Sequence, residues 1–125
     1  MKTFFKKKPR EFEVGNNKKF QMKDCGEILL DTNEQVTFKN NDNMEFDVAK
    51  KDWGYYATPS INWRLKNFGF KTLLIKNLKT NRFFIFLLEK GKNKLLNEYI
   101  KNENLKIICD LDNEQTLSKI ESVNF

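Results

Sequence analysis

The residues best suited to binding a ligand gather in one short stretch, residues 50–64, which reads KKDWGYYATPSINWR. Both tryptophans of the chain and two of its three tyrosines lie here, among acidic and basic side chains. An aromatic ring covers the apolar face of a sugar, a nucleotide or a peptide, while polar groups beside it fix the orientation. The stretch therefore predicts a binding site for a small polar ligand, made of Asp52, Trp53, Tyr55, Tyr56, Trp63 and Arg64. The alternative is that these rings join a sheet to a helix.

A second candidate is the N-terminal segment, MKTFFKKKPR, which holds five basic residues and no acidic one. Such a segment contacts phosphates or an acidic protein surface by charge, and Phe4 and Phe5 can stack on bases or cover an apolar patch. The anion-binding residues predicted here are Lys6, Lys7, Lys8 and Arg10. The alternative is a solvated, flexible terminus that adds solubility.

The net charge of +6 belongs to the start of the chain. Residues 1–23 carry eight basic and two acidic residues, whereas residues 24–125 carry fifteen of each. Twenty of the 23 basic residues are lysine, which an AT-rich coding sequence would also favour. The charge thus indicates a basic segment attached to a neutral body.

Two other stretches combine lysine with glycine. Residues 66–73, KNFGFKTL, are similar to half of the aromatic strand motif of RNA-recognition and cold-shock domains, but a glycine that ends a helix explains them better. Residues 89–94, EKGKNK, join an expected strand to an expected helix, where a helix N-terminus and lysines favour an anion. Only the Gly-Lys of a Walker loop is present, so we expect a surface turn.

The sequence gives little support to catalysis. The chain has no histidine, which removes the commonest general base and the commonest zinc ligand. Cys25 and Cys109 lack redox or metal spacing. Asp52 beside a tyrosine, or Cys25 beside Lys23, is at most suggestive. We therefore favour a non-enzymatic protein without a metal or a cofactor.

Hydrophobic periodicity indicates the elements that must position these residues. In the first half, apolar and polar residues alternate between turns rich in Asn, Asp and Gly, which is typical of antiparallel hairpins. The predicted strands cover residues 11–14, 20–22, 27–30, 35–38, 44–48 and 55–57.

The second half changes to a mixed pattern. Thr58 as cap and Pro59 as first residue predict a helix that ends at Gly69. Strands are predicted over 70–76 and 82–89, with continuous apolar runs typical of burial on both faces. A helix around 95–100 and a strand over 105–111 complete a β-α-β unit, and a helix follows Asn113.

These elements predict an α+β fold, with N-terminal antiparallel β-hairpins followed by a helix, a β-hairpin, a β-α-β unit and a C-terminal helix. We expect a basic segment over 1–10 and a single domain over 11–125. No apolar run is long enough for a membrane span, and KKKPR interrupts any signal peptide, so we expect a cytoplasmic protein.

The leading functional hypothesis is a binding or accessory domain that contacts an anionic partner, either nucleic acid or an acidic protein surface. Its contacts would be the basic N-terminus and the aromatic stretch. The alternatives are a small carbohydrate- or nucleotide-sugar-binding or -modifying protein that uses residues 52–64, and a homo-oligomeric structural protein. The last would follow if an apolar strand within 70–88 formed an unprotected edge.

Overall fold

The computed structural model describes residues 1–125 except for the side chain of Thr58, so the predicted cap at Thr58 lies outside the described residues. In chain order the elements are β1 (Lys2–Val14), β2 (Phe20–Leu29), β3 (Gln35–Lys39), β4 (Glu45–Lys51), β5 (Gly54–Thr58), α1 (Arg64–Asn67), β6 (Phe70–Asn77), β7 (Phe83–Glu89), α2 (Asn93–Glu103), β8 (Leu105–Asp110) and α3 (Glu114–Ser122). None of the helices in the described chain is both long and apolar enough to cross a membrane.

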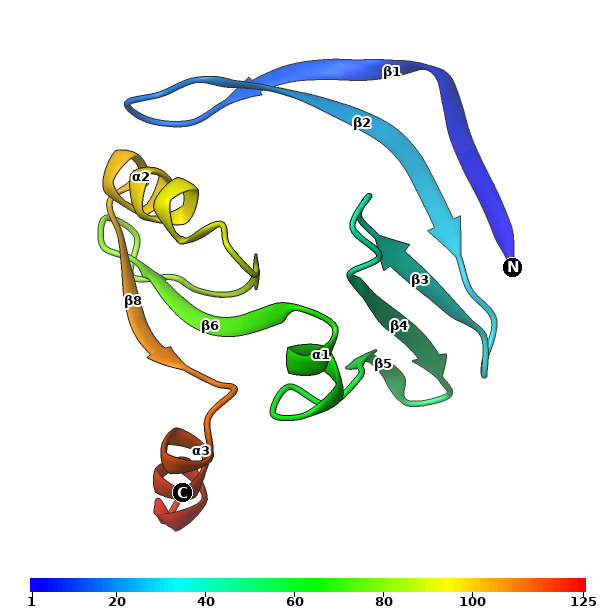
Figure 1. Ribbon diagram of the computed structural model, residues 1–125. Helices are drawn as coiled ribbons and strands as arrows, with labels where there is room; N and C mark the ends of the chain where they lie inside the picture. Colours follow the sequence, from blue (N-terminus) through cyan, green and yellow to red (C-terminus); the bar gives the residue numbers. More distant parts are fainter.

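The strands form three antiparallel sheets, which confirms the predicted α+β fold. The sheet orders are β1-β2, β3-β4-β5 and β7-β6-β8. The β1–β2 hairpin arches over the rest of the chain, from the side of β3 to α2 (Figure 1). Strands β7 and β8 are both antiparallel to β6 and flank it, so they run parallel to each other. The predicted β-α-β unit is therefore present, with β6 between its two strands.

The predicted hairpins are present in the register that alternation requires. Val14 pairs with Phe20, and Val36 pairs with Val48. The first hairpin is longer than predicted, because β1 reaches back to Lys2 and β2 continues through the expected separate strand at 27–30. Its register shifts between Phe5 and Arg10, so that residues 6–9 form a bulge opposite Cys25.

The helix predicted from Pro59 is much shorter in the structure, where α1 covers only Arg64–Asn67. Strand β5 remains paired with β4 as far as Thr58, opposite Asp47, and residues 61–63 form a turn before α1 begins. Trp63 then adopts φ −142° and ψ −81°, which is not helical. The helix ends as predicted beside Gly69, whose φ is +97°.

Strand β6 carries the densest part of the core. Leu73 and Ile75 are buried together with Leu88 of β7, and side chains of α2 pack against this group. Burial on both faces holds for β6, but the same prediction is wrong for β7. Strand β7 lies at the edge of its sheet, and Phe83, Phe84 and Ile85 are exposed. An apolar run alone does not separate a central strand from an edge strand.

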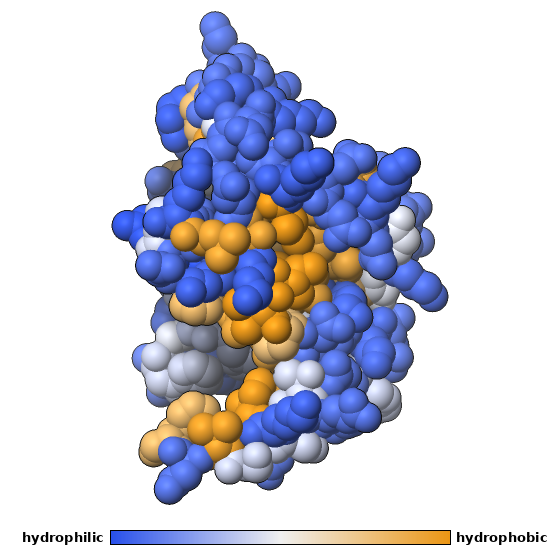
Figure 2. Space-filling view, turned by 90° about the vertical axis from the view of Figure 1, so that its left-hand side faces the viewer, coloured by the Kyte–Doolittle hydropathy of each residue, from blue (hydrophilic) through white to orange (hydrophobic). Residues whose placement is uncertain are grey.

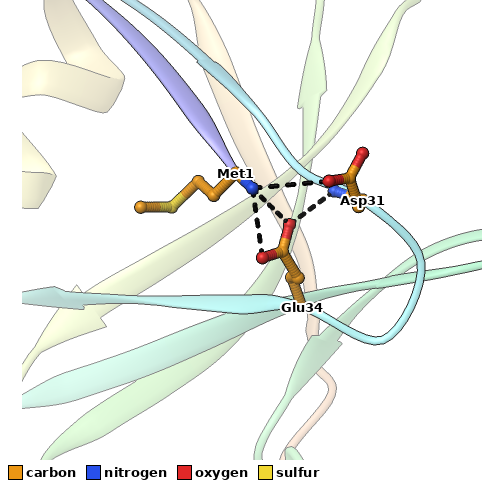
Figure 3. Close-up of polar contacts among 3 residues, drawn as sticks. All are labelled: Met1, Asp31 and Glu34. Atoms are coloured by element: carbon orange, nitrogen blue, oxygen red, sulfur yellow. Dashed lines mark hydrogen bonds and ion pairs between the residues drawn. The ribbon is translucent and has the colours of Figure 1, made fainter.

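The β1–β2 hairpin is attached to the body at both ends. At one end, the Met1 amino group lies 2.8 Å from the Glu34 carboxylate and 3.4 Å from that of Asp31 (Figure 3). At the other end, the Asn16 backbone N–H donates to the Glu103 carboxylate at 3.1 Å, and the Phe20 ring packs on Tyr99 of α2. An isolated two-stranded hairpin is only marginally stable in water, so these attachments matter.

We expect Ile75→Ala to lower the free energy of unfolding by about 2–5 kcal/mol, because Ile75 is fully buried and its removal leaves a cavity. Urea denaturation followed by circular dichroism measures the change. Ile108→Ala is the matched control, since Ile108 is 40% exposed on β8, and it should cost far less. Equal losses from the two variants would contradict the proposed core.

The attachment at Met1 should depend on pH at both extremes. The hydrogen bond with Glu34 raises the pKa of the amino group above its ordinary 8.0, and the same bond, with that from the Asp31 N–H, lowers the pKa of Glu34 below 4.5. The attachment is therefore complete between about pH 4.5 and 8. It is lost as the pH rises through the amine's raised pKa, or falls through the lowered pKa of Glu34.

Backbone ¹³C chemical shifts of residues 2–5, measured from pH 3 to 10, should show loss of strand structure at both limits. Residues 10–14 serve as the internal control and should change less. Glu34→Gln should loosen residues 2–5 even at neutral pH, because the amide carries no charge. Shifts of residues 2–5 that stay constant from pH 3 to 10 would refute the attachment.

Candidate anion-binding site

The predicted aromatic site is spread over the surface. The rings of Trp53 and Tyr56 stack with centroids 5.9 Å apart, and Trp53 is 67% exposed. Tyr55 and Tyr56 are neighbours on β5, so their side chains point to opposite faces. Trp63 is 68% exposed beside α1, outside this stacked pair.

The polar members of the aromatic stretch also lie apart from one another. The guanidinium of Arg64 lies over the Phe68 ring at 5.5 Å, and Asp52 is exposed in the β4–β5 turn. Lys50 Nζ lies 5.2 Å from the centre of the Tyr55 ring. The structure therefore brings Trp53 and Tyr56 together as an exposed surface, while Arg64 and Tyr55 make other contacts.

The predicted basic residues of the N-terminus lie on β1 and its bulge. Two of them are matched by one carboxylate, since Asp24 lies 2.9 Å from Lys6 Nζ and 3.8 Å from Arg10 Nε. The hydrogen bond from Lys6, with that from the Gly26 N–H, lowers the pKa of Asp24. Lys7 and Lys8 are exposed in the bulge. The local excess of charge is therefore smaller than the sequence indicates.

A hollow of about 410 Å³, which we call the lysine pocket, lies where the β6, β7 and β8 ends meet α1 and α2. It is built from the two lysine–glycine stretches of the sequence. The Lys90 backbone N–H donates to the Gly69 carbonyl at 2.8 Å, which holds the β7–α2 turn against the end of α1. Side chains that line the pocket include Lys66, Phe70, Lys71, Lys90, Asn93 and Asp112.

Both turns that shape the lysine pocket depend on glycine. Gly69 and Gly91 have φ of +97° and +85°, a region that side-chain-bearing residues rarely adopt. At Gly69 an added Cβ would also lie 3.0 Å from the Met44 side chain. The glycines therefore allow the chain to turn sharply at both places, and Lys66 and Lys90 lie beside the pocket.

The charges around the lysine pocket are unequal. Three lysines line it, and Lys71 is paired with Asp110 at 2.8 Å, a hydrogen bond that raises the pKa of Lys71. Asp112 is the acidic residue of the lining and is only 5% exposed. Asn93 opens α2, whose N-cap residue Lys92 makes no side-chain capping bond. The first N–H groups of α2 add partial positive charge.

The two stretches that form the lysine pocket are each visible in the sequence, but their proximity in the folded chain is not. Lys90 and Gly91 form the expected turn between β7 and α2, and residues 66–69 do end a helix. The available signal was the repeated pairing of lysine with a turn glycine, at Lys66 to Gly69 and at Lys90–Gly91. A stretch of about twenty residues separates the two, so only the folded sheet shows that they meet.

The chemistry that the lysine pocket offers is binding. Ammonium groups and helix N–H groups attract an anion, while a buried carboxylate accepts hydrogen bonds from hydroxyl groups. Among the residues that the structure describes, no three potential metal ligands of the Cys, Asp and Glu type converge. Comparison of the chain with known protein families, curated proteins and solved structures gives no match.

Proposed function

We propose that this protein is a non-enzymatic binding module whose lysine pocket takes a small phosphorylated ligand that also carries hydroxyl groups, such as a sugar phosphate. The observation that supports this is the convergence of three lysines and a buried carboxylate on one hollow beside the start of α2. The ligand is anionic, as expected from the sequence, but it binds at the lysine pocket and not at the basic N-terminus.

The size and lining of the pocket favour a ligand larger than a simple ion. A hollow of about 410 Å³ lies within the usual range for small-molecule sites. Lys66 and Lys90 have no acidic partner among the described ion pairs, so their ammonium groups are available to a phosphate. Phe70 and Leu88 supply apolar wall, against which carbon atoms of a sugar can lie.

Asp112 favours a phosphorylated ligand with hydroxyl groups over inorganic phosphate. A buried carboxylate repels a bare phosphate dianion, and this repulsion is stronger in a site of low dielectric than in water. The same carboxylate accepts a hydrogen bond from a sugar hydroxyl, and a bond to a charged group is stronger than a neutral one. A ligand with both groups therefore satisfies the lysines and Asp112 together, while inorganic phosphate satisfies the lysines alone.

Isothermal titration calorimetry with ribose 5-phosphate and inorganic phosphate tests the proposal. Lys90→Gln and Lys66→Gln should each weaken ribose 5-phosphate binding by about tenfold, since each removes a charged hydrogen-bond donor. Lys79→Gln is the matched control, because Lys79 lies in the β6–β7 turn and makes no part of the pocket lining. If the three variants weaken binding equally, or the wild type binds neither probe, the proposal fails.

Asp112→Asn separates a built pocket from general lysine attraction. Removal of the carboxylate should raise the affinity for inorganic phosphate, because the repulsion is lost. It should also lower the ratio of ribose 5-phosphate affinity to phosphate affinity by about tenfold. A variant that strengthens binding of both probes by the same factor would show that Asp112 does not contact the hydroxyl groups.

A second candidate function, binding of single-stranded nucleic acid by the N-terminal hairpin, is favoured by the β1 bulge. Lys7 and Lys8 are exposed there, and Phe4 and Phe5 are 56% and 65% exposed on the adjoining strand. Lysines and exposed rings together are the usual elements of such a surface. Deletion of residues 1–10 would remove most of the pairing partner of β2, so point substitutions give the cleaner test.

The double variant Lys7→Gln/Lys8→Gln should flatten the salt dependence of oligonucleotide binding. Each phosphate contact contributes about 0.7 to the slope of log affinity against log salt concentration for a single strand, so the slope should fall by about 1.4. Fluorescence anisotropy with a labelled oligothymidine between 50 and 200 mM NaCl measures it. Lys79→Gln/Lys106→Gln is the control, and an equal change there would exclude a specific role for the bulge.

A further inference from the structure

The outer edge of β7 is not paired with another strand, although the Asn40 side chain donates a hydrogen bond to the Glu89 carboxylate at its end. Strand β7 pairs with β6 on one side and ends its sheet on the other. Its first residues are apolar and exposed, with Phe83 at 56% and Ile85 at 58% exposure. On the face shown in Figure 2, hydrophobic side chains gather in a patch below the more hydrophilic upper part of the molecule. Edges of this kind readily pair with another strand.

The second half of β7 lines a groove, whereas its first residues are exposed. A groove of about 760 Å³ is lined by residues 85–89 of β7 and by Phe38, Phe46 and Phe70. The stacked rings of Phe38 and Phe46 give its other side an apolar surface. One strand thus carries exposed apolar side chains at its start and an apolar groove at its end.

We propose that a second copy of this chain covers the edge, with β7 pairing antiparallel to β7 of the partner subunit. A two-fold axis perpendicular to the sheet preserves the face of each side chain and places Ile85 opposite Ile85 of the partner subunit. Phe83 then lies opposite Leu87 of the partner subunit. The exposed apolar half of each strand then lies against the groove-lining half of the other, and the two three-stranded sheets become one of six strands.

The exposed area of a single chain supports this occupant. The chain exposes 9700 Å², whereas a monomeric protein of 14.9 kDa exposes about 7,000 Å². The excess of about 2,700 Å² exceeds the roughly 1,000–2,500 Å² that each subunit buries in an obligate homodimer. The β1–β2 hairpin, most of whose residues are exposed, also contributes to this excess.

The charges at the two ends of β7 are also complementary under this symmetry. Arg82 precedes the strand and Glu89 ends it. In the antiparallel pair, Arg82 of one subunit lies beside the Glu89 end of the other, and the arrangement occurs twice. A parallel pairing would instead place like charges together, so charge favours the antiparallel arrangement.

Light scattering coupled to size-exclusion chromatography measures the mass of the full chain. We expect the wild type at twice 14.9 kDa and Ile85→Lys at 14.9 kDa, with an unchanged circular dichroism spectrum because Ile85 is exposed. Ile108→Lys is the matched control on the opposite edge strand, β8, and should remain dimeric. A monomeric wild type, or a dimer that Ile108→Lys disrupts and Ile85→Lys does not, would overturn the proposal.

A cross-link tests the register. In a background of Cys25→Ser and Cys109→Ala, Ile85→Cys should form an intersubunit disulfide under mild oxidation, since opposite Cα atoms lie about 4.5–5.5 Å apart. Phe83→Cys should not, because its symmetry mate lies four residues away along the strand, about 13 Å. Cross-linking of both variants to equal extents, or of Phe83→Cys alone, would overturn this register.

Discussion

The arrangement of the chain depends on the burial of one strand, β6. Its odd-numbered residues Leu73 and Ile75 form the core with Leu88, and β7 and β8 pair with its two edges. Strand β6 begins shortly after α1. Gly69, just before the strand, and Lys71, near its start, therefore lie beside the β7–α2 turn. The same strand therefore fixes the core, places the lysine pocket at its start and leaves β7 as an edge.

A small core explains why so much of the surface is apolar. Seven apolar residues are buried among those described, and many large apolar side chains are exposed. The stability that burial supplies scales with the area removed from water, so this chain has little of it for its length. Coverage of the β7 edge by a second copy and occupation of the pocket would each add burial or contacts that the isolated chain lacks.

Local patterns of sequence predict those parts of the fold whose partners are close in the chain. Val36 and Val48 alternate correctly around a polar turn, and their hairpin is present in that register. The helix predicted from Pro59 is shorter because residues 61–63 form a turn and the backbone of Trp63 is not helical. The predicted burial of β7 on both faces is wrong, because a continuous apolar run such as Phe83 to Leu88 occurs both in central strands and in edge strands.

The position of the lysine pocket could not be predicted from the charge of the sequence, for a different physical reason. Its cations come from residues 24–125, where basic and acidic residues balance, so net charge gives no hint of it. In the basic N-terminus, which holds the whole excess, the single carboxylate of Asp24 lies beside both Lys6 and Arg10. Ligand attraction depends on charges within a Debye length in the folded chain, and pairing decides which of them remain available. The distribution of charge along the sequence therefore does not indicate which basic side chains remain unpaired or lie close together in the folded chain.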